Sequence, residues 1–180
     1  MASHIALLRG VNVGGHQAIA MARLRAFFGE LGLGGAQTVL QSGNVVFSAP
    51  GKAKAQWEPQ LEREALQRLQ LTTSFFVRTA AEWRALIAAN PFPEAARDDP
   101  SHLVVLFLKA PVTTAVLRGL QAAIVGPETV RAVGLQAYIT YPDGIGRSRL
   151  TPARLDARLG QRGTARNWNT VRKLGALVGA

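Results

Sequence analysis

The sequence predicts an α+β protein made of two tandem ferredoxin-like units, each with the order βαββαβ and each followed by an extra helix. Strand and helix patterns occur in the same order in both halves of the chain. A length of 180 residues suits two such units packed as one compact protein. A stretch rich in Pro and Asp predicts a linker at 91–101, between a first half at 1–90 and a second half at 102–180.

The composition is that of a globular protein and excludes several other classes. Hydrophobic residues make up 48% of the chain and charged residues 18%, which excludes a disordered protein. No apolar run approaches the roughly 18 residues that cross a bilayer. The absence of cysteine excludes a disulfide framework and a thiolate nucleophile. The N-terminus lacks a basic region before its apolar residues, so we expect a first strand, no signal peptide and a cytoplasmic protein.

The first half begins with a strand, a helix and a hairpin. Residues 5–8 form a short apolar run that ends in a turn, as a buried strand would. Apolar residues recur at helical spacing over 20–31, and the glycines that follow end this helix. Two β-prone runs, 38–41 and 44–48, flank a two-residue turn at Ser42–Gly43.

A helix, a strand and a second helix complete the first half. Apolar residues between positions 57 and 69 line one face of a helix, and residues 73–78 form a β-prone run. Thr79 and Glu82 have the spacing of a capping box, which opens a short helix. That helix ends where the sequence Asn-Pro-Phe-Pro begins at residue 90, because proline disfavours helical geometry in the residue before it.

The second half repeats this order. Residues 103–108 are all apolar, as expected of a central strand that is covered on both faces, and a helix covers 116–124. Strands at 129–133 and 136–141 pair around Gly134–Leu135.

A helix, a short strand and a final helix end the chain. Thr151–Pro152 is a strong helix start and Gly160 a helix stop. A short strand at 164–166 leads into the last helix, which begins near Asn167.

The segment Gly144–Lys173 carries eight cations and one acid, a net charge of +7 in a chain whose total is +10. Such a segment is expected to attract phosphate, nucleic acid or another anion. The alternative is that the charge only aids solubility, because the chain favours arginine over lysine throughout and coding preference alone can produce this bias.

Four stretches together resemble the bacterial family catalogued as domain of unknown function 1697: Leu8–Gly15, Gln41–Phe47, Asp143–Ser148 and Gly163–Thr170. The resemblance extends from about residue 4 to residue 177 and implies no assigned activity. The family often has a lysine after the double glycine, where this chain has His16–Gln17. This departure weakens any anion site in that loop.

The first candidate site is the glycine-rich loop at 10–15 between a strand and a helix. Its backbone amides could approach a phosphate, with Arg9 and Asn12 as the side chains beside it. The spacing matches neither the dinucleotide fingerprint nor a Walker A loop. A tight turn that requires positive φ is the favoured alternative.

The second candidate site is Gly144–Arg149, where Arg147, Ser148 and Arg149 could surround an anion with bidentate guanidinium contacts. A nucleophilic role for Ser148 is disfavoured, because the sequence around it lacks the second glycine of a nucleophile elbow and supplies no identifiable base. The alternative is a glycine turn that leads into the N-cap at Thr151.

A third candidate site combines Arg166 and Asn169, which could bind a nucleic-acid base together with Trp168. The alternative places Trp168 in the core, because it shares a helical stripe with later apolar residues. Asn44 could donate a hydrogen bond to a ligand, although the hairpin turn is the favoured explanation there. The three histidines lack metal-ligand spacing, so we predict no metal, and we predict no cofactor.

The leading functional hypothesis is an anion-binding module, with nucleic acid the favoured partner of the basic segment. The alternative is an enzyme that acts on a small phosphorylated metabolite and uses Arg147, Arg149 and Arg166 as a clamp. A third hypothesis is a structural or dimerisation protein without a ligand. A deep pocket would favour the enzyme and a broad, flat basic surface would favour nucleic acid. We predict no association with a membrane and assign no oligomeric state.

Overall fold

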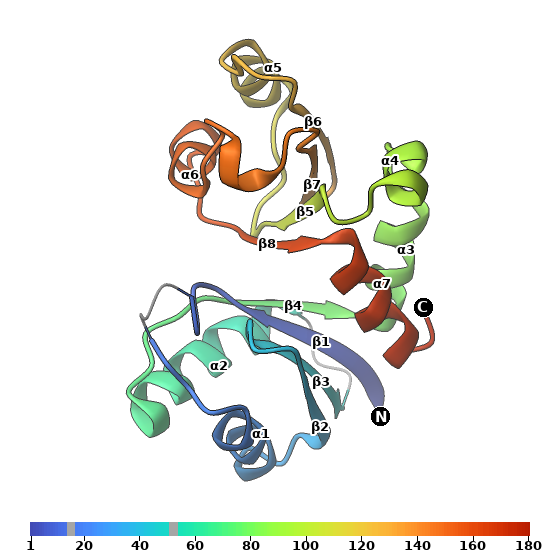
Figure 1. Ribbon diagram of the computed structural model, residues 1–180. Coiled ribbons are helices and arrows are strands. Elements are labelled where there is room, and N and C mark those ends of the chain that lie inside the picture. The colour runs from blue at the N-terminus through green and yellow to red at the C-terminus, as the bar shows by residue number, and fades with distance from the viewer. Residues whose placement is uncertain (14–16, 51–53) are drawn as a thin grey trace. The chain divides into compact units, whose positions relative to one another are not determined.

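Two four-stranded antiparallel sheets contain all eight strands of residues 1–13, 17–50 and 54–180, the part of the chain that the computed structural model describes (Figure 1). The chain divides into two compact units. Unit 1 comprises Met1–Arg84 and Leu174–Ala180, and unit 2 comprises Ala85–Lys173. The predicted α+β class is confirmed. Within the described residues, no helix has both the length and the apolar character that a bilayer span requires.

Unit 1 contains four strands and two helices between them. Its sheet has the order β2-β3-β1-β4, so β1 pairs with a neighbour on each side. One helix connects β1 to β2 and the other connects β3 to β4. The elements are β1 (Ala2–Leu8), α1 (Met21–Glu30), β2 (Gly34–Val39), β3 (Asn44–Ala49), α2 (Lys54–Leu69) and β4 (Phe75–Thr79).

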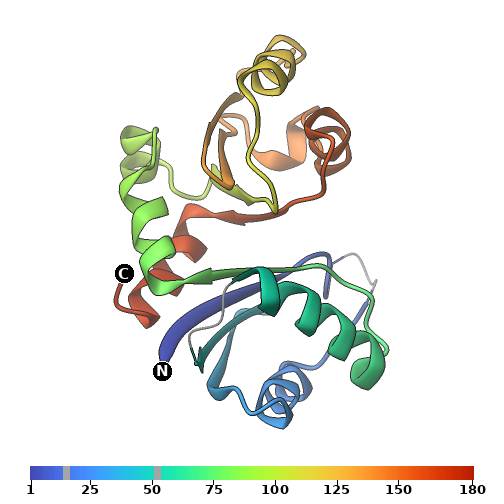
Figure 2. The ribbon, with the colours of Figure 1, turned by 180° about the vertical axis from the view of Figure 1, so that it is seen from behind.

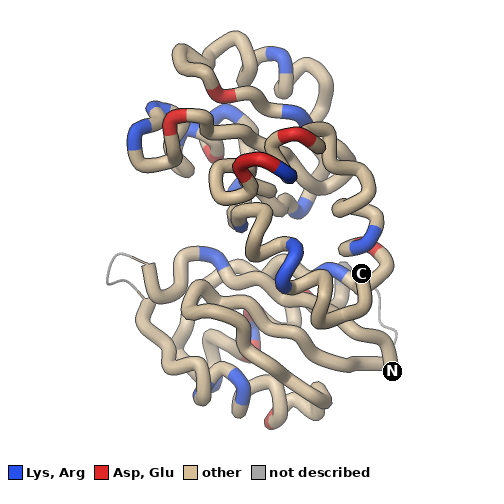
Figure 3. Tube along the Cα trace, turned by 45° about the vertical axis from the view of Figure 1, so that its right-hand side comes forward, with Lys and Arg blue, Asp and Glu red and all other residues tan. Residues whose placement is uncertain are grey.

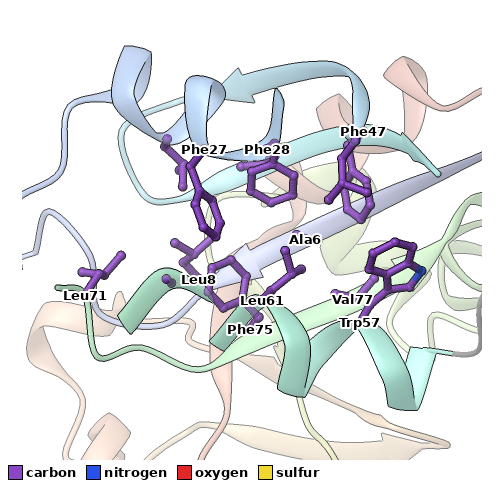
Figure 4. Close-up of a cluster of buried hydrophobic side chains, with 14 of the residues drawn as sticks. Ala6, Leu8, Phe27, Phe28, Phe47, Trp57, Leu61, Leu71, Phe75 and Val77 are labelled. Atoms are coloured by element: carbon purple, nitrogen blue, oxygen red, sulfur yellow. The ribbon is translucent and has the colours of Figure 1, made fainter. Parts of the chain in front are cut away.

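Aromatic side chains from α1, β3, α2 and β4 pack with aliphatic side chains in the core of unit 1 (Figure 4). The ring of Phe28 on α1 lies 5.1 Å from that of Phe47 on β3, and the Phe47 ring lies 6.1 Å from that of Trp57 on α2. Both helices therefore cover the same face of the sheet, as the front and back views show (Figures 1 and 2). Helical spacing in α1 and α2 and alternation in β3 direct these residues inward.

Unit 2 repeats this arrangement with the strand order β6-β7-β5-β8. The central strand β5 is buried along its whole length, as its apolar sequence predicts. Leu120 of one helix and Leu155 and Leu159 of the other pack with β5 in a single core. The elements are β5 (Leu103–Phe107), α5 (Thr114–Ala122), β6 (Thr129–Val133), β7 (Gln136–Thr140), α6 (Pro152–Leu159) and β8 (Thr164–Asn167).

Four further elements lie outside these two repeats. Helix α3 (Ala80–Ala88) follows β4, and α7 (Trp168–Leu177) follows β8. A short 3₁₀ helix, η1 (Ile145–Arg147), lies between β7 and α6. The stretch 91–101, predicted as a linker, contains the short helix α4 (Pro93–Asp98), which begins with a proline in its first turn. Proline is compatible with this position because its missing N–H would have no helical partner there.

The predicted start signals of α3 and α6 and the predicted stop signal of α6 are confirmed. The backbone N–H of Thr79 donates to Oε2 of Glu82 at 2.8 Å, and the N–H of Glu82 donates to Oγ1 of Thr79 at 3.1 Å, which completes the capping box. Thr151 accepts a hydrogen bond from the N–H of Arg154 at the start of α6. Gly160 ends α6 in the left-handed conformation with φ of 65°.

The two hairpins differ in how well the sequence predicts them. The two-residue turn at Gly134–Leu135 is confirmed by the pairing of Val133 with Gln136. The predicted two-residue turn at Ser42–Gly43 is wrong, because Val39 pairs with Asn44 and leaves a four-residue loop. The buried Asn44 side chain closes this loop, since its Nδ2 donates to the Val39 carbonyl at 2.8 Å.

Gly163, immediately before β8, occupies a place that admits no larger residue. A Cβ there would lie 2.7 Å from Leu106 Cδ1 and 2.8 Å from the Phe107 carbonyl oxygen. We expect Gly163→Ala to lower the free energy of unfolding by about 1–3 kcal/mol, because it overpacks the edge of the core. The matched change Gly119→Ala, in open space on α5, should raise it by about 0.5–1 kcal/mol. Urea denaturation of both variants tests this, and equal effects would contradict it.

Both tyrosines of the chain are buried, and burial raises the pKa of each to about 12, with the Glu128 carboxylate adding to the effect at Tyr141. Because the folded-state pKa values exceed the unfolded value of about 10, the folded protein favours the neutral phenols. The stability they contribute is complete below pH of about 10 and is lost as the pH rises towards about 12. A titration of tyrosinate absorbance should therefore show little ionisation near pH 10 in the native protein and full ionisation in guanidinium. Native ionisation centred near pH 10 would contradict the burial of these side chains.

Candidate functional site

Two pockets in unit 2 share a wall at Glu128. The α5–α6 pocket has a volume of about 330 Å³ and lies beside both helices, with Leu120, Arg154 and Arg158 in its lining. The η1 pocket has a volume of about 440 Å³ and includes Arg147 of the 3₁₀ helix. Residues that line both pockets are Val125, Gly126, Glu128 and Arg149.

Helix α6 places two of the arginines on the wall of the α5–α6 pocket. Arg154 and Arg158 are four residues apart, so they lie on one exposed face, while Leu155 and Leu159 are buried in the core. Arg149 precedes the N-cap of α6, and its carbonyl accepts a hydrogen bond from Nη1 of Arg154 at 3.1 Å. The packing of α6 therefore fixes the positions from which these guanidinium groups extend.

The α5–α6 pocket carries a net positive charge. Its lining contains Arg149, Arg154 and Arg158 against the single acid Glu128. Within the described ranges, none of these three arginines forms an ion pair. The η1 pocket is balanced, because Arg147 and Arg149 face Glu128 and Asp143 there. The α5–α6 pocket is therefore the one that attracts an anion.

Glu128 is held in the shared wall with only 7% of its surface exposed. The Ser148 hydroxyl donates to its Oε1, and the same hydroxyl oxygen accepts from the N–H of Leu150 at 2.9 Å. The Tyr141 hydroxyl donates to the Leu150 carbonyl at 3.3 Å and so supports this arrangement. A Cβ on Gly126 would overlap with the Glu128 carboxylate, so glycine at 126 leaves the space that the carboxylate fills.

The predicted residues of the second candidate site all lie at these pockets. Arg147 and Arg149 are exposed, and Arg149 lines both pockets. Ser148 is held between Glu128 and Leu150. The glycine turn predicted as the alternative is also present, because Gly144 has a φ of 83° and leads through η1 towards Thr151.

The predicted residues of the first candidate site lie in unit 1 and serve its backbone. Asn12 has a left-handed φ of 55°, and its side chain accepts from the N–H of Ile19 at 2.8 Å and donates to the carbonyls of Ile19 and Gln41. The half-buried Arg9 makes backbone hydrogen bonds to Ser74 and Thr73. Residues 14–16, with the double glycine and His16, lie outside the described part of the chain.

Arg166 and Asn169 of the third candidate site do not line either pocket. Arg166 is buried, and its Nη1 donates to Thr164 Oγ1 at 2.9 Å and to the Ala165 carbonyl at 2.7 Å. Burial lowers the pKa of Arg166 to about 10, which leaves the guanidinium charged at neutral pH. Asn169 is exposed on the first turn of α7, and Trp168 is buried, as its core interpretation predicts.

Three residues of the pockets, Glu128, Arg154 and Arg158, were not predicted as site residues from the sequence. The spacing of Arg154 and Arg158 within the basic segment is a signal that could have identified them. No comparable signal marks Glu128, because it meets Ser148 only through the fold, 20 residues along the chain. Figure 3 shows Lys and Arg along the traces of both units, so positive charge alone does not locate the site.

No group of three or more His, Cys, Asp or Glu side chains that could hold a metal ion occurs among residues 1–13, 17–50 and 54–180. The candidate site is thus formed by arginines, one buried carboxylate and an apolar wall. Its apolar part comes from Leu120, Ala123, Ile124, Val125, Leu150 and Ala157.

Comparison with known proteins identifies the family but no activity. The fold is similar to that of a solved structure, the conserved bacterial protein SP0830 from Streptococcus pneumoniae, with a TM-score of 0.78 and 22% sequence identity over 98% of each chain. No curated protein matches the sequence. The family model described as "Protein of unknown function (DUF1697)" matches residues 1–138, which include Glu128 but not the arginines at 147–158. The chain belongs to this family of proteins of unknown function.

Proposed function

We propose that this protein binds a phosphorylated small molecule in the α5–α6 pocket. The observation that carries the proposal is the set of three exposed arginines, Arg149, Arg154 and Arg158, which line one pocket without an acidic partner in the described ranges. The volume of about 330 Å³ falls within the range of small-molecule sites. Guanidinium groups suit phosphate because they donate two parallel hydrogen bonds to its oxygens.

The apolar wall of the pocket supports a ligand that is more than an inorganic ion. Six apolar residues from α5, α6 and the segments next to them line the space beside the arginines. Small-molecule sites combine such a wall with a few polar groups that fix orientation. The ligand we propose therefore has a phosphate at the arginines and a compact organic body against the wall.

Nucleic acid, the leading hypothesis from the sequence, is the second candidate. Exposed arginines extend beyond the pocket to Arg147 and Arg162, which favours a longer polyanion. Two observations weigh against it. The first is that Arg166 is buried. The second is that the sheet aromatics Phe107 and Tyr138 are also buried, so neither offers a ring on which a base could stack.

We also propose that each unit is a ferredoxin-like domain. The strand orders β2-β3-β1-β4 and β6-β7-β5-β8 support this, since in each unit a helix follows the first strand and another follows the third. This fold serves many unrelated functions, so the functional proposal depends on the pocket and not on the fold.

Removal of two pocket arginines should abolish most of the phosphate affinity. We expect the Arg149→Ala/Arg158→Ala variant to bind inorganic pyrophosphate at least about 100-fold more weakly than the wild type, because each lost guanidinium removes a charge-assisted hydrogen bond of about 1.5–3 kcal/mol. Isothermal titration calorimetry measures this change. Arg25→Ala/Arg118→Ala is the matched control, because it removes the same charge from exposed arginines outside the pocket. An equal loss in the control would mean that only net charge matters.

A salt series separates the small molecule from nucleic acid. With fluorescent oligonucleotides in about 0.15 M salt, we expect dissociation constants no tighter than the roughly micromolar values of non-specific binding. Anisotropy measurements provide these constants. A submicromolar dissociation constant would contradict this expectation. If the logarithm of the association constant also falls steeply with the logarithm of salt concentration, the arginines at 147–162 belong to a nucleic-acid surface.

A further inference from the structure

We propose that Glu128 is a specificity-determining residue that accepts a hydrogen bond from a hydroxyl group of the ligand. The pocket would then take a phosphorylated polyol, such as a sugar phosphate or a glycerol phosphate, in preference to a phosphate ester without hydroxyl groups. This inference rests on the proposed function, because it assumes that the arginines of the α5–α6 pocket hold the phosphate.

One oxygen of Glu128 has no hydrogen-bond partner in the described part of the protein. Oε1 accepts from the Ser148 hydroxyl, whereas Oε2 accepts no hydrogen bond from any described residue. The residue is only 7% exposed and lines the pocket. Because Oε2 is not one of the fully buried unpartnered atoms of the described residues, it is open to solvent at the pocket wall, where a donor on a ligand can replace water as its partner.

The Glu128 carboxylate is held in place before any ligand arrives. Ser148 holds Oε1, and the N–H of Leu150 holds the Ser148 hydroxyl oxygen at 2.9 Å. On the other side, Gly126 provides space that no Cβ could share with the carboxylate. A polar group fixed by its neighbours binds a donor at little further entropic cost.

The charges around the pocket also favour a ligand with a hydroxyl donor. A carboxylate beside Arg149, Arg154 and Arg158 weakens the attraction of the pocket for phosphate. A ligand that donates a hydroxyl hydrogen bond to Glu128 offsets this loss, whereas a simple phosphate ester does not. A buried polar group left unpaired discriminates strongly against the ligand that lacks the matching group.

Two phosphate esters with the same carbon chain test this inference by calorimetry. Glycerol 3-phosphate carries two hydroxyl groups, and n-propyl phosphate carries none. We expect the wild type to bind glycerol 3-phosphate roughly 10- to 100-fold more tightly than n-propyl phosphate, as expected for one hydrogen bond to a charged group. Equal affinity for the two esters would overturn the inference. A tenfold preference for 2-aminoethyl phosphate over glycerol 3-phosphate would overturn the assignment of a hydroxyl donor.

Two variants locate the preference at Glu128. Glu128→Gln should reduce the preference for glycerol 3-phosphate at least about fivefold, because a neutral amide forms a weaker hydrogen bond with a hydroxyl group. The same change should not weaken n-propyl phosphate binding, because the amide no longer repels phosphate. Gly126→Ala should also reduce it, because the new Cβ displaces the carboxylate while the net charge stays unchanged. Glu94→Gln, at an exposed acid on α4 outside both pockets, is the matched control and should leave the preference unchanged. A preference that persists in both Glu128→Gln and Gly126→Ala would overturn the role of Glu128.

The possible failures are distinguishable. If the wild type binds pyrophosphate through the arginines but does not discriminate between the two esters, the specificity inference is wrong and the proposed function stands. If the wild type binds neither pyrophosphate nor either ester, the proposed function is wrong and the inference is wrong with it. Thermal unfolding of each variant shows whether a loss of binding reflects a loss of the fold.

Discussion

The antiparallel pairing of β5 with both β7 and β8 is the constraint on which unit 2 depends. Neither neighbour of β5 directly follows it in the chain, so the connections from β5 to β6 and from β7 to β8 run outside the sheet. They contain α5 and α6, whose apolar side chains bury in the same core. This burial sets the two helices side by side (Figure 1). The α5–α6 pocket lies beside these helices, with Leu120 of the core and the exposed Arg154 and Arg158 in its lining.

Each unit has a buried arginine at the equivalent place in its sheet, although the two halves show no evident sequence identity. Arg78 of β4 and Arg166 of β8 are both buried, and each lies opposite the central strand, at Ile5 and at Val105 respectively. In both, Nη1 donates to the carbonyl of the preceding residue, at 2.8 Å and 2.7 Å. The next residue caps the following helix in each case. In both units, the buried arginine thus bonds to the backbone of its own strand.

Local signals predicted most of the fold, and long-range contacts account for what was missed. The capping box at Thr79 and the helix start at Thr151 depend on a few neighbouring residues, so sequence spacing suffices to find them. The four-residue loop before Asn44 was missed because Leu40 adopts a left-handed φ of 60°, which its residue type does not favour. Arg147, Ser148 and Arg149 were predicted as a group, whereas the partner of Ser148, Glu128, becomes visible only when the chain is folded.

The central claim is that the arginines around the α5–α6 pocket, and not the basic segment as a whole, form the anion site. Amide chemical-shift mapping of isotope-labelled protein titrated with inorganic pyrophosphate tests it most directly. We predict that the largest shifts fall in two stretches, 123–128 and 149–158, which contain all the pocket residues except Leu120. Shifts centred on Arg172 and Lys173 of α7, or spread evenly over the exposed arginines of both units, would contradict it.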